Sequence, residues 1–387
     1  MNLRFRLMRN SPALAVGVAA MLVAGCGAAS NTGTNATAAN VALATRLADA
    51  SMRPVTWTAP GPAIPVGQSL SGDKVVLVAN GQNQFTETAG AAMKQAGAVA
   101  GVSVITDYTD GTLTAAESGI QEAITVHAKA IALMSFQTSA LEGPIKAAIA
   151  AGIPVIQMGE HDPGPLSTAE TAAGVASDIT ACYSCAGADI ADFIVSASKG
   201  KAHVLFINSP DIGDATSEMN GFQAQMTRLC PACTVQTAGI PIPDWATQIA
   251  ATVSSAITAH PDINYIVPVF DVMSSFVTPA IKAANATTRV KLASFNASSA
   301  EMVQMQSGAT PAWLTDGGFD LTWFGWNAMD DIFRSMLKKP ALASESLPLR
   351  FFTSKTVGGY DFSGAQDPWY GNPQYVRGYT KLWGISG

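Results

Sequence analysis

The stretch KVVLVANGQNQFTETAGAAMKQAGAVAGVSVITDY, residues 74–108, decides the fold class. It joins an apolar, β-branched run (74–80) to a helix-forming segment (86–100) and then to a second apolar run (102–108). Because the first run is apolar from residue 75 to residue 79 and the second is rich in valine and isoleucine, they are typical of strands in a parallel sheet that helices cover on both faces.

The same alternation continues along the chain in two series. The first has predicted strands at 74–80, 102–108, 129–135 and 153–159, with helices at 86–100, 114–127 and 139–151. The second begins after GVASD (174–178), with helices at 187–198, 218–229, 245–259 and 274–285 and strands at 202–208, 233–239, 264–270 and 290–296. A helix at 320–337 and a strand at 347–354 are expected to cross back between the two series. We therefore predict an α/β protein of two Rossmann-like lobes with parallel sheets, residues 73–176 with 320–346 and residues 177–319 with 347–387.

The N-terminus has the pattern of a lipoprotein export signal. A basic segment, MNLRFRLMR, precedes an apolar segment of about 15 residues, which is short for a membrane span. Small residues lead to Cys26, so we predict a signal peptide at 1–25, lipidation of Cys26 and attachment to the outer side of the cell membrane. The alternative is an uncleaved N-terminal anchor, which also leaves the bulk of the chain extracytoplasmic. Small polar residues at 27–45 and prolines at 54–67 indicate a flexible tether and an extended lead-in over 26–72.

The charge of the chain argues against nucleic acid as a partner. The formal net charge is -6, and loss of residues 1–25, which hold three arginines and no acidic residue, brings it to -9. No basic run remains that could bind phosphates. A hydrophobic content of 48% with 13% charged residues is typical of a packed α/β protein.

Four cysteines form two C-x-x-C pairs, Cys182 with Cys185 and Cys230 with Cys233. In an exported chain, disulfides are favoured over metal binding. The first pair precedes one predicted helix and the second pair follows another, so we favour two local disulfides. Cross-pairing, a zinc site and thioredoxin-like redox activity are the alternatives.

Catalytic signatures are missing from the sequence. It has no P-loop, no G-x-S-x-G elbow and no H-E-x-x-H pair. The four histidines, at 127, 161, 203 and 260, do not have the spacing of metal ligands, and only His161 follows a predicted strand end closely enough to touch a cleft. We therefore predict no enzyme activity, no cofactor and no metal.

Polar and aromatic residues gather where the predicted strands end. In open parallel sheets, ligands bind at the carboxyl ends of the strands. The segments at those ends are 80–85, 135–138, 159–162, 209–218, 244–245, 270–271 and 296. Flat apolar rings beside fixed donors and acceptors suit a ring-shaped solute that carries hydroxyl groups.

At this point the chain resembles the sugar-type (type I) periplasmic substrate-binding proteins. VANGQNQFTETAGAAMKQAG is similar to their first strand and helix, and AIAAGIPVIQMGEHD, NGFQAQM, PDWATQIAATVSSAITAHPDINYIVPVFDVMSS and VKLASFNASS follow in that family's order. The likeness covers about residues 73–340. It implies two lobes joined by a three-segment hinge, which close on a small solute and present it to an ABC permease.

The resemblance also implies which residues bind the ligand. It places Asn83 and a stacking Phe85 in the first loop and a second stacking ring at Trp245. Where the family has an Asn-Asp pair, this chain has Phe270 in place of the Asn and keeps the acid as Asp271. Glu160 and Glu218 stand where many sugar binders have arginines, Asn296 stands where Asp is common, and Phe319 replaces a common Gln beside Asp320. With Gln137 from its strand end, the expected ligand-binding residues are Asn83, Phe85, Gln137, Glu160, Glu218, Trp245, Phe270, Asp271, Asn296, Phe319 and Asp320.

These departures make the expected cleft more aromatic and more acidic than a ribose site. Where arginines would donate to sugar hydroxyls, two carboxylates accept, so we hypothesise a cationic or donor-rich guest with an apolar face: an amino sugar, an amine-bearing ring or a polyol. In the alternative, Glu160 and Glu218 are solvated and a neutral sugar binds through other residues.

The predicted function is that of a monomeric solute-binding lipoprotein of an ABC importer. One alternative is a sensory lipoprotein that reports its ligand to a membrane kinase or chemoreceptor. Another is an extracytoplasmic enzyme that uses Glu160 and Glu218 as acid and base. Fold alone does not separate these functions.

Overall fold

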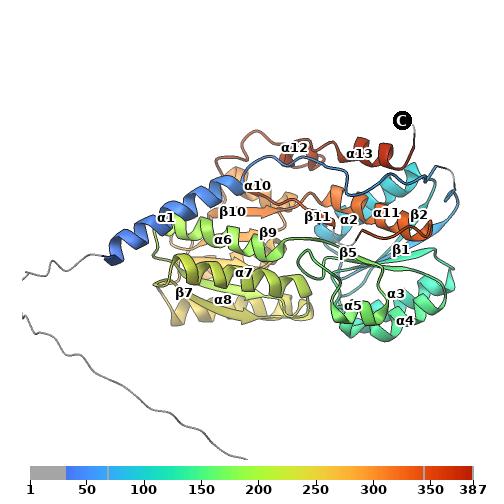
Figure 1. Ribbon diagram of the computed structural model, residues 1–387. Helices are drawn as coiled ribbons and strands as arrows, with labels where there is room; N and C mark the ends of the chain where they lie inside the picture. The colour runs from blue at the N-terminus through green and yellow to red at the C-terminus, as the bar shows by residue number, and fades with distance from the viewer. Residues whose placement is uncertain (1–31, 68, 343–344, 386–387) are drawn as a thin grey trace, which may run out of the picture.

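The computed structural model describes residues 32–67, 69–342 and 345–385. Two sheets form the centres of two lobes (Figure 1). The signal peptide and Cys26 lie outside the described residues, as do residues 27–31 of the expected tether. Among the described residues, no helix combines the length and apolar character that a membrane span needs.

The N-terminal lobe is built on a sheet with the strand order β11-β5-β4-β3-β1-β2, in which every pairing is parallel. Val75 and Leu77 pack in one apolar cluster and Val76 and Val78 in another, so both faces of β1 are buried, as its continuous apolar run predicts. The strands are β1 (Lys74–Ala79), β2 (Ser103–Tyr108), β3 (Ala130–Met134), β4 (Val155–Met158), β5 (Ser177–Ala181) and β11 (Glu345–Leu347). The helices are α2 (Gln84–Val99), α3 (Leu113–Thr125), α4 (Glu142–Ala150), α5 (Thr168–Ala173) and α11 (Leu321–Met336), with a 3-10 turn at Thr138–Ala140.

The C-terminal lobe repeats this plan with the order β12-β10-β9-β8-β6-β7, except that β12 pairs antiparallel to β10. Its strands are β6 (His203–Asn208), β7 (Thr234–Gly239), β8 (Tyr265–Pro268), β9 (Lys291–Phe295), β10 (Trp313–Gly318) and β12 (Arg350–Phe352). Its helices are α6 (Tyr183–Ser198), α7 (Gly213–Leu229), α8 (Trp245–Ala259), α9 (Ser274–Ala283) and α10 (Ser299–Ser307), with 3-10 turns at Ile242–Asp244 and Asp271–Met273. The predicted α/β class with two lobes and parallel sheets is confirmed.

Three segments connect the lobes: β5 to α6, β10 to α11, and β11 to β12. The expected boundary at residue 176 is wrong by one strand, because β5 pairs with β4 in the N-terminal lobe. The single strand expected at 347–354 is two short strands, one in each sheet, so the third connection is residues 348–349. This connection, Pro348-Leu349, continues the apolar sequence of Leu347, and this hid the break between the two strands.

The expected flexible tether is wrong for its described part. Residues 32–51 form helix α1 (Thr32–Ser51), and Ala44 and Ala48, four residues apart, are buried. The hydroxyl groups of Thr45 and Ser196 in α6 lie 2.7 Å apart, and Asn40 donates to the carbonyl of Leu229. Small residues that suggested flexibility are therefore the ones that let α1 lie close to the C-terminal lobe, and alanine favours a helix intrinsically.

The segment after α1 and the C-terminal tail run together across both lobes (Figure 1). The amides of Val55, Ile64 and Val66 donate to the carbonyls of Tyr370, Leu382 and Trp383, which lie in or after α12 (Asp367–Tyr370) and α13 (Tyr375–Leu382). The tail was expected to belong to the C-terminal lobe, but its last part packs on the N-terminal lobe. Trp383 stacks on Trp326 of α11, with ring centroids 5.4 Å apart, because α11 offers buried indole rings that the aromatic tail covers.

Within each C-x-x-C pair the two cysteines are adjacent in space. The Cα atoms lie 5.1 Å apart for Cys182 and Cys185 and 5.3 Å apart for Cys230 and Cys233, with the sulfurs at bonding distance. The pairs sit at the start of α6 and just after α7. This local arrangement is the one the sequence favours over cross-pairing.

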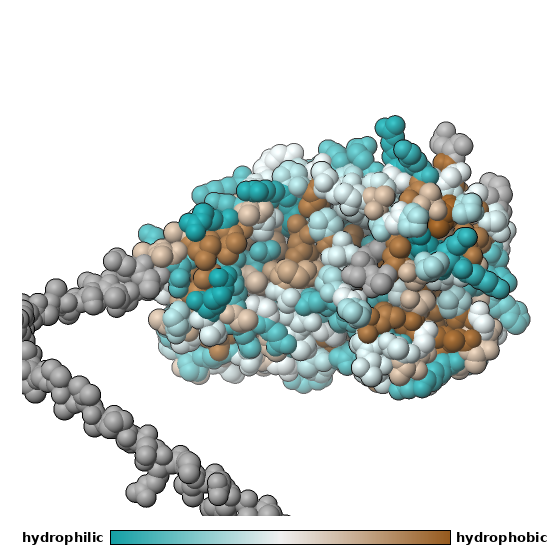
Figure 2. Space-filling model, viewed as in Figure 1, coloured by the Kyte–Doolittle hydropathy of each residue, from teal (hydrophilic) through white to brown (hydrophobic). Residues whose placement is uncertain are grey.

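On the face that Figure 2 shows, apolar residues form separate patches among hydrophilic ones. Among the described residues, the exposed large apolar side chains are Val99, Ile105, Leu113, Val303 and Val376, which lie far apart in the sequence. Isolated apolar residues of this kind are normal on a folded protein.

Candidate ligand-binding cleft

A narrow cavity lies between the lobes, at the carboxyl ends of the strands of both sheets. It holds about 380 Å³ of atom-free space, part of which is open to solvent. The lining residues are Asn80, Asn83, Phe85, Thr86, Ser135, Ile212, Asp214, Ile242, Trp245, Phe270, Val272 and Asn296. Both lobes contribute, so a guest in this cavity contacts both halves of the hinge.

The lobes are in contact around this cavity. A Cβ on Gly213 would lie 2.4 Å from the carbonyl oxygen of Glu160, so only glycine allows this approach. Gln137 donates to the carbonyl of Pro210 at 3.2 Å across the same gap. The arrangement is a closed one, in which a guest would be surrounded.

Aromatic rings form the apolar walls. The indole N–H of Trp245 donates to the carbonyl of Ile240 at 3.1 Å, which fixes the ring, and its centroid lies 6.4 Å from that of Phe270. On the opposite lobe, Phe85 packs edge-on against Phe319, with centroids 6.1 Å apart. Phe319 itself is buried beneath Phe85, so it supports the wall and does not line the cavity.

Two of the lining residues carry buried polar atoms without protein partners. Asn80 donates to the carbonyl of Ser135 at 2.9 Å, yet its side-chain oxygen is buried without a hydrogen bond. The same holds for Oδ1 of Asp214. Since buried polar atoms are nearly always hydrogen-bonded, these acceptors indicate where a guest would donate.

Asp214 and Glu218 form a carboxyl pair one turn apart on α7, here called the α7 carboxyl pair. Glu218 is fully buried, and both of its carboxyl oxygens lack hydrogen bonds. Neither residue takes part in any of the ion pairs formed within the described part of the chain. Burial raises the pKa of Asp214 to about 8, and burial together with the charges of Asp214 and Asp271 raises the pKa of Glu218 well above its usual value.

Two glycines fix the position of this pair. A Cβ on Gly187 of α6 would lie 1.9 Å from the carbonyl of Glu218, and one on Gly221 of α7 would lie 2.0 Å from that of Ser184. The two helices can cross this closely only because both positions lack a side chain. The close crossing buries Glu218 and sets Asp214 at the cavity.

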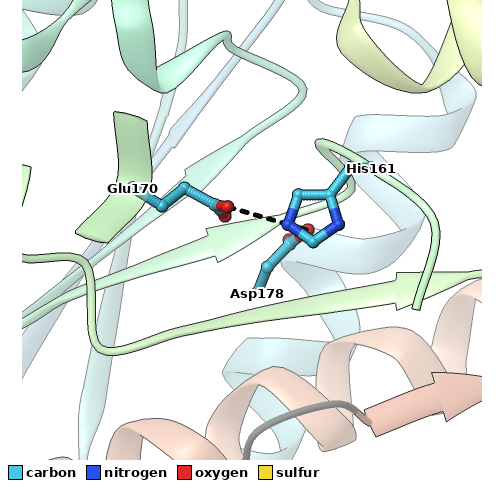
Figure 3. Close-up of side chains that lie close together, drawn as sticks. All are labelled: His161, Glu170 and Asp178. Carbon is cyan, nitrogen blue, oxygen red and sulfur yellow. Dashed lines mark hydrogen bonds and ion pairs between the residues drawn. The ribbon is translucent and has the colours of Figure 1, made fainter. Parts of the chain in front are cut away.

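A second group of charges lies beside the cleft in the N-terminal lobe. His161, Glu170 and Asp178, here called the histidine cluster, come from the loop after β4, from α5 and from β5 (Figure 3). His161 Nε2 lies 2.7 Å from Glu170 Oε2 and 3.6 Å from Asp178 Oδ2. The hydrogen bond to Glu170 raises the pKa of His161 to about 9, against the effect of burial.

The structure brings five of the eleven expected binding residues to the cavity: Asn83, Phe85, Trp245, Phe270 and Asn296. Asn83 also caps α2, where its side chain accepts from the amide of Thr86 at 3.2 Å. Gln137 bridges the lobes, and Glu160 is turned to Thr138, whose amide donates to it at 3.0 Å.

Three further expected residues have structural partners. Asp271 accepts from the amide of Ser298 at 2.6 Å, Asp320 caps α11 by accepting from the amides of Thr322 and Trp323, and Phe319 lies under Phe85. Glu218 lies below the cavity, one turn from Asp214.

Sequence reasoning did not single out Asn80, Thr86, Ser135, Ile212, Asp214, Ile242 and Val272. Five of these lie in or next to the strand-end segments 80–85, 135–138 and 209–218. Asp214 could have been found from its spacing, because residues i and i+4 of a helix share a face and Glu218 was already expected at the site.

The sequence of residues 74–332 matches the family described as the periplasmic binding protein domain. The chain is also similar in structure to a sugar ABC transporter protein from Yersinia enterocolitica subsp. enterocolitica 8081, with a TM-score of 0.67, 16% identity and coverage of 83% of this chain and 100% of that chain. A 5-methylthioribose transporter solute-binding protein from Thermotoga lettingae has a TM-score of 0.67, 18% identity and coverage of 83% and 99%.

A solute-binding protein from Agrobacterium vitis, bound with α-D-tagatopyranose, has a TM-score of 0.66, 17% identity and coverage of 74% and 96%. No curated protein sequence matches this chain. The family match covers well over half of the sequence, and the two-lobed fold agrees with it. The chain therefore belongs to the periplasmic binding protein family, whose type I members are extracytoplasmic solute-binding proteins and not enzymes.

Proposed function

We propose that this protein is the receptor subunit of an ABC importer, and that its cleft binds a small ring compound carrying an amine or several hydroxyl groups. The observation that carries the proposal is the α7 carboxyl pair, which offers buried acceptors without protein donors beside the aromatic walls. Phe85 and Trp245 offer apolar faces from opposite lobes to a ring in the cavity, and the donors of such a guest would satisfy Asp214 and Asn80.

An amine-bearing ring, such as an amino sugar, satisfies this site better than a neutral sugar does. Three hydrogens of an ammonium group can each donate, and its charge would lower the raised pKa values of Asp214 and Glu218, so that binding releases their protons and leaves carboxylate acceptors. The α-D-tagatopyranose bound to the relative from Agrobacterium vitis supports a ring-shaped guest. They do not carry the charge argument, which comes from this chain's own residues.

The proposed route to the membrane is lipidation of Cys26 after removal of residues 1–25. We also propose that the two cysteine pairs are oxidised as local disulfides outside the cytoplasm. Mass spectrometry of the mature chain tests both, because it detects a lipidated N-terminal Cys26 and the cross-linked peptides 182–185 and 230–233. An unmodified N-terminus that retains Met1 would contradict the anchor.

A thermal-shift screen of the mature chain without its lipid tests the ligand class. A guest that binds only the folded state raises the melting temperature as its concentration exceeds Kd. Glucose, ribose, inositol, glucosamine and gluconate are compared at equal concentration. The expected order is glucosamine above the neutral compounds and no shift with gluconate, whereas tight binding of gluconate would contradict the charge argument.

The expected monomeric state stays a prediction, which sedimentation of the mature chain tests. No feature of the described residues favours the sensory alternative, and the permease is proposed as the partner because this family's fold converts solute binding into a change of shape.

A further inference from the structure

We propose that the histidine cluster is a binding site for a divalent transition-metal ion such as Zn²⁺, separate from the ligand cleft. The three side chains each offer one ligand atom, and these atoms all lie within 4.8 Å of one another. They come from three different elements, and Figure 3 shows both carboxyl groups facing the imidazole ring. None of the three residues lines the cleft cavity.

The imidazole ring is held in the orientation that a metal ligand needs. His161 Nδ1 lies 2.6 Å from the carbonyl oxygen of Asp162, and a carbonyl oxygen can only accept, so Nδ1 donates. Nε2 is then the atom that faces Glu170 and Asp178. A backbone carbonyl that fixes the ring in this way is the usual outer partner of a metal-bound histidine.

A buried oxygen of Glu170 favours a metal site over a simple ion pair between His161 and Glu170. Glu170 is fully buried; its Oε2 accepts from His161 and from the amide of Ser167, while its Oε1 has no hydrogen bond. A proton shared between His161 and Glu170 leaves Oε1 unpaired. A cation contacted by both carboxyl oxygens satisfies it, and carboxylates bind cations in this two-oxygen mode.

The donor set selects the class of metal. One neutral imidazole and two carboxylates balance a charge of +2, and the mixture of nitrogen and oxygen donors suits Zn²⁺ and its neighbours, whereas Ca²⁺ and Mg²⁺ prefer oxygen alone. Ligand atoms at about 2.0–2.2 Å from a tetrahedral zinc lie roughly 3.3–3.6 Å apart. His161 Nε2 and Asp178 Oδ2, 3.6 Å apart, already have this spacing. His161 Nε2 and Glu170 Oε2, 2.7 Å apart, must separate by less than about 1 Å more.

The histidine cluster is accessible to an ion and lies next to a segment that connects the lobes. The His161 side chain is 23% exposed, so an ion can enter. A bound ion would join the loop after β4 to β5, the strand from which the chain first crosses to the other lobe. That loop also carries Glu160, which contacts Gly213 across the gap.

Calorimetric titration of the mature chain with Zn²⁺, with both cysteine pairs oxidised, tests the site. One ion per chain is expected for the wild type, with affinity at least tenfold weaker in His161→Ala. The matched control is His203→Ala, because His203 Nδ1 also lies 3.2 Å from a carboxylate, that of Asp262, but these two side chains are 34% and 59% exposed. Its zinc affinity is expected to equal that of the wild type.

Asp178→Asn is the second variant, since it keeps the size of the side chain while removing its charge. It also is expected to weaken zinc binding at least tenfold, and circular dichroism verifies the fold of each variant. Titration with Co²⁺ supplies a visible absorption spectrum that reports nitrogen and oxygen ligation. Folded wild-type protein that does not bind Zn²⁺ saturably, or equal affinity in the wild type and both variants, would overturn the site.

Discussion

The histidine cluster and the α7 carboxyl pair lie in different lobes and treat buried carboxylates in opposite ways. In the N-terminal lobe, Glu170 accepts from His161 and from the amide of Ser167. In the C-terminal lobe, Glu218 accepts from nothing in the described residues. Since a buried carboxylate without a partner is costly, Glu170 is compensated within the protein through Oε2, whereas Glu218 is poised for donors from outside.

The largest expected effect is the loss of Glu170. We expect Glu170→Gln to lower the free energy of unfolding by about 3 kcal/mol, because it removes the nearer carboxylate partner of His161 and the charged acceptor of the Ser167 amide, and leaves Asp178 at 3.6 Å as the remaining partner of the imidazole. Urea denaturation with a chelator present measures this. The control is Glu142→Gln, whose pair with Lys146 is exposed, and we expect a change below about 0.5 kcal/mol. Equal effects of the two substitutions would contradict the expected difference between the buried carboxylate Glu170 and the exposed carboxylate Glu142.

The corresponding change in the other lobe should have the opposite sign. Glu218→Gln replaces a carboxyl group whose pKa burial raises with a neutral amide, so we expect the ligand-free protein to gain about 1 kcal/mol or more at pH 7. Affinity for an amine-bearing guest should fall about tenfold, because Glu218 lies one turn from Asp214, below the cavity, and the amide can no longer take on a negative charge close to the ammonium group. Urea denaturation and calorimetry measure the two quantities; a less stable variant with undiminished affinity would contradict the functional role of the pair.

The pH dependence of stability sharpens the same contrast. Burial raises the pKa of Asp214 to about 8, so between about pH 4 and pH 8 the folded state holds a proton that the unfolded state has lost. This contribution is fully present at low pH and is lost as the pH rises through about 8. The slope of unfolding free energy against pH should therefore be less negative in Asp214→Asn, and identical slopes would refute the raised pKa.

The smallest expected effect concerns Asn83, which both caps α2 and lines the cavity. Asn83→Ala removes the cap of α2 and should lower the free energy of unfolding by about 1 kcal/mol, whereas Asn83→Asp keeps an accepting oxygen and should change it little. Thermal unfolding measures both. If binding of glucosamine also falls in the alanine variant alone, the capping oxygen and not the amide nitrogen matters for the site.

Most of the fold could be predicted because its signals are local. The continuous apolar runs at 74–80 and 202–208 correspond to β1 and β6, and the helix predicted at 245–259 is α8. α1 could not be predicted in the same way, since its stability comes from Ala44 and Ala48 packing against the C-terminal lobe. β5 was missed because Ser177-Asp178-Ile179-Thr180-Ala181 is polar for a buried strand.

The candidate site could be predicted as a set of strand ends but not as a set of side chains. Phe85 and Trp245 line the cavity as expected, while Phe319 and Asp271 do not. Which way a side chain points after a strand depends on what competes for it. Asp271 is drawn to Ser298 and Asp320 to the amides of α11, and both partners lie on segments whose position the sequence alone does not give.

By itself, the sequence determined the two-lobed α/β architecture and the acidic, aromatic character of the strand ends, because hydrophobic period and residue type are written directly in the chain. Only the tertiary structure decided which carboxylates are compensated. Glu170 meets His161 across a folded loop, and Glu218 meets no donor because Gly187 and Gly221 let two helices close over it. The physical reason is that the cost of a buried charge depends on its neighbours in space, and those neighbours exist only once distant segments have packed together.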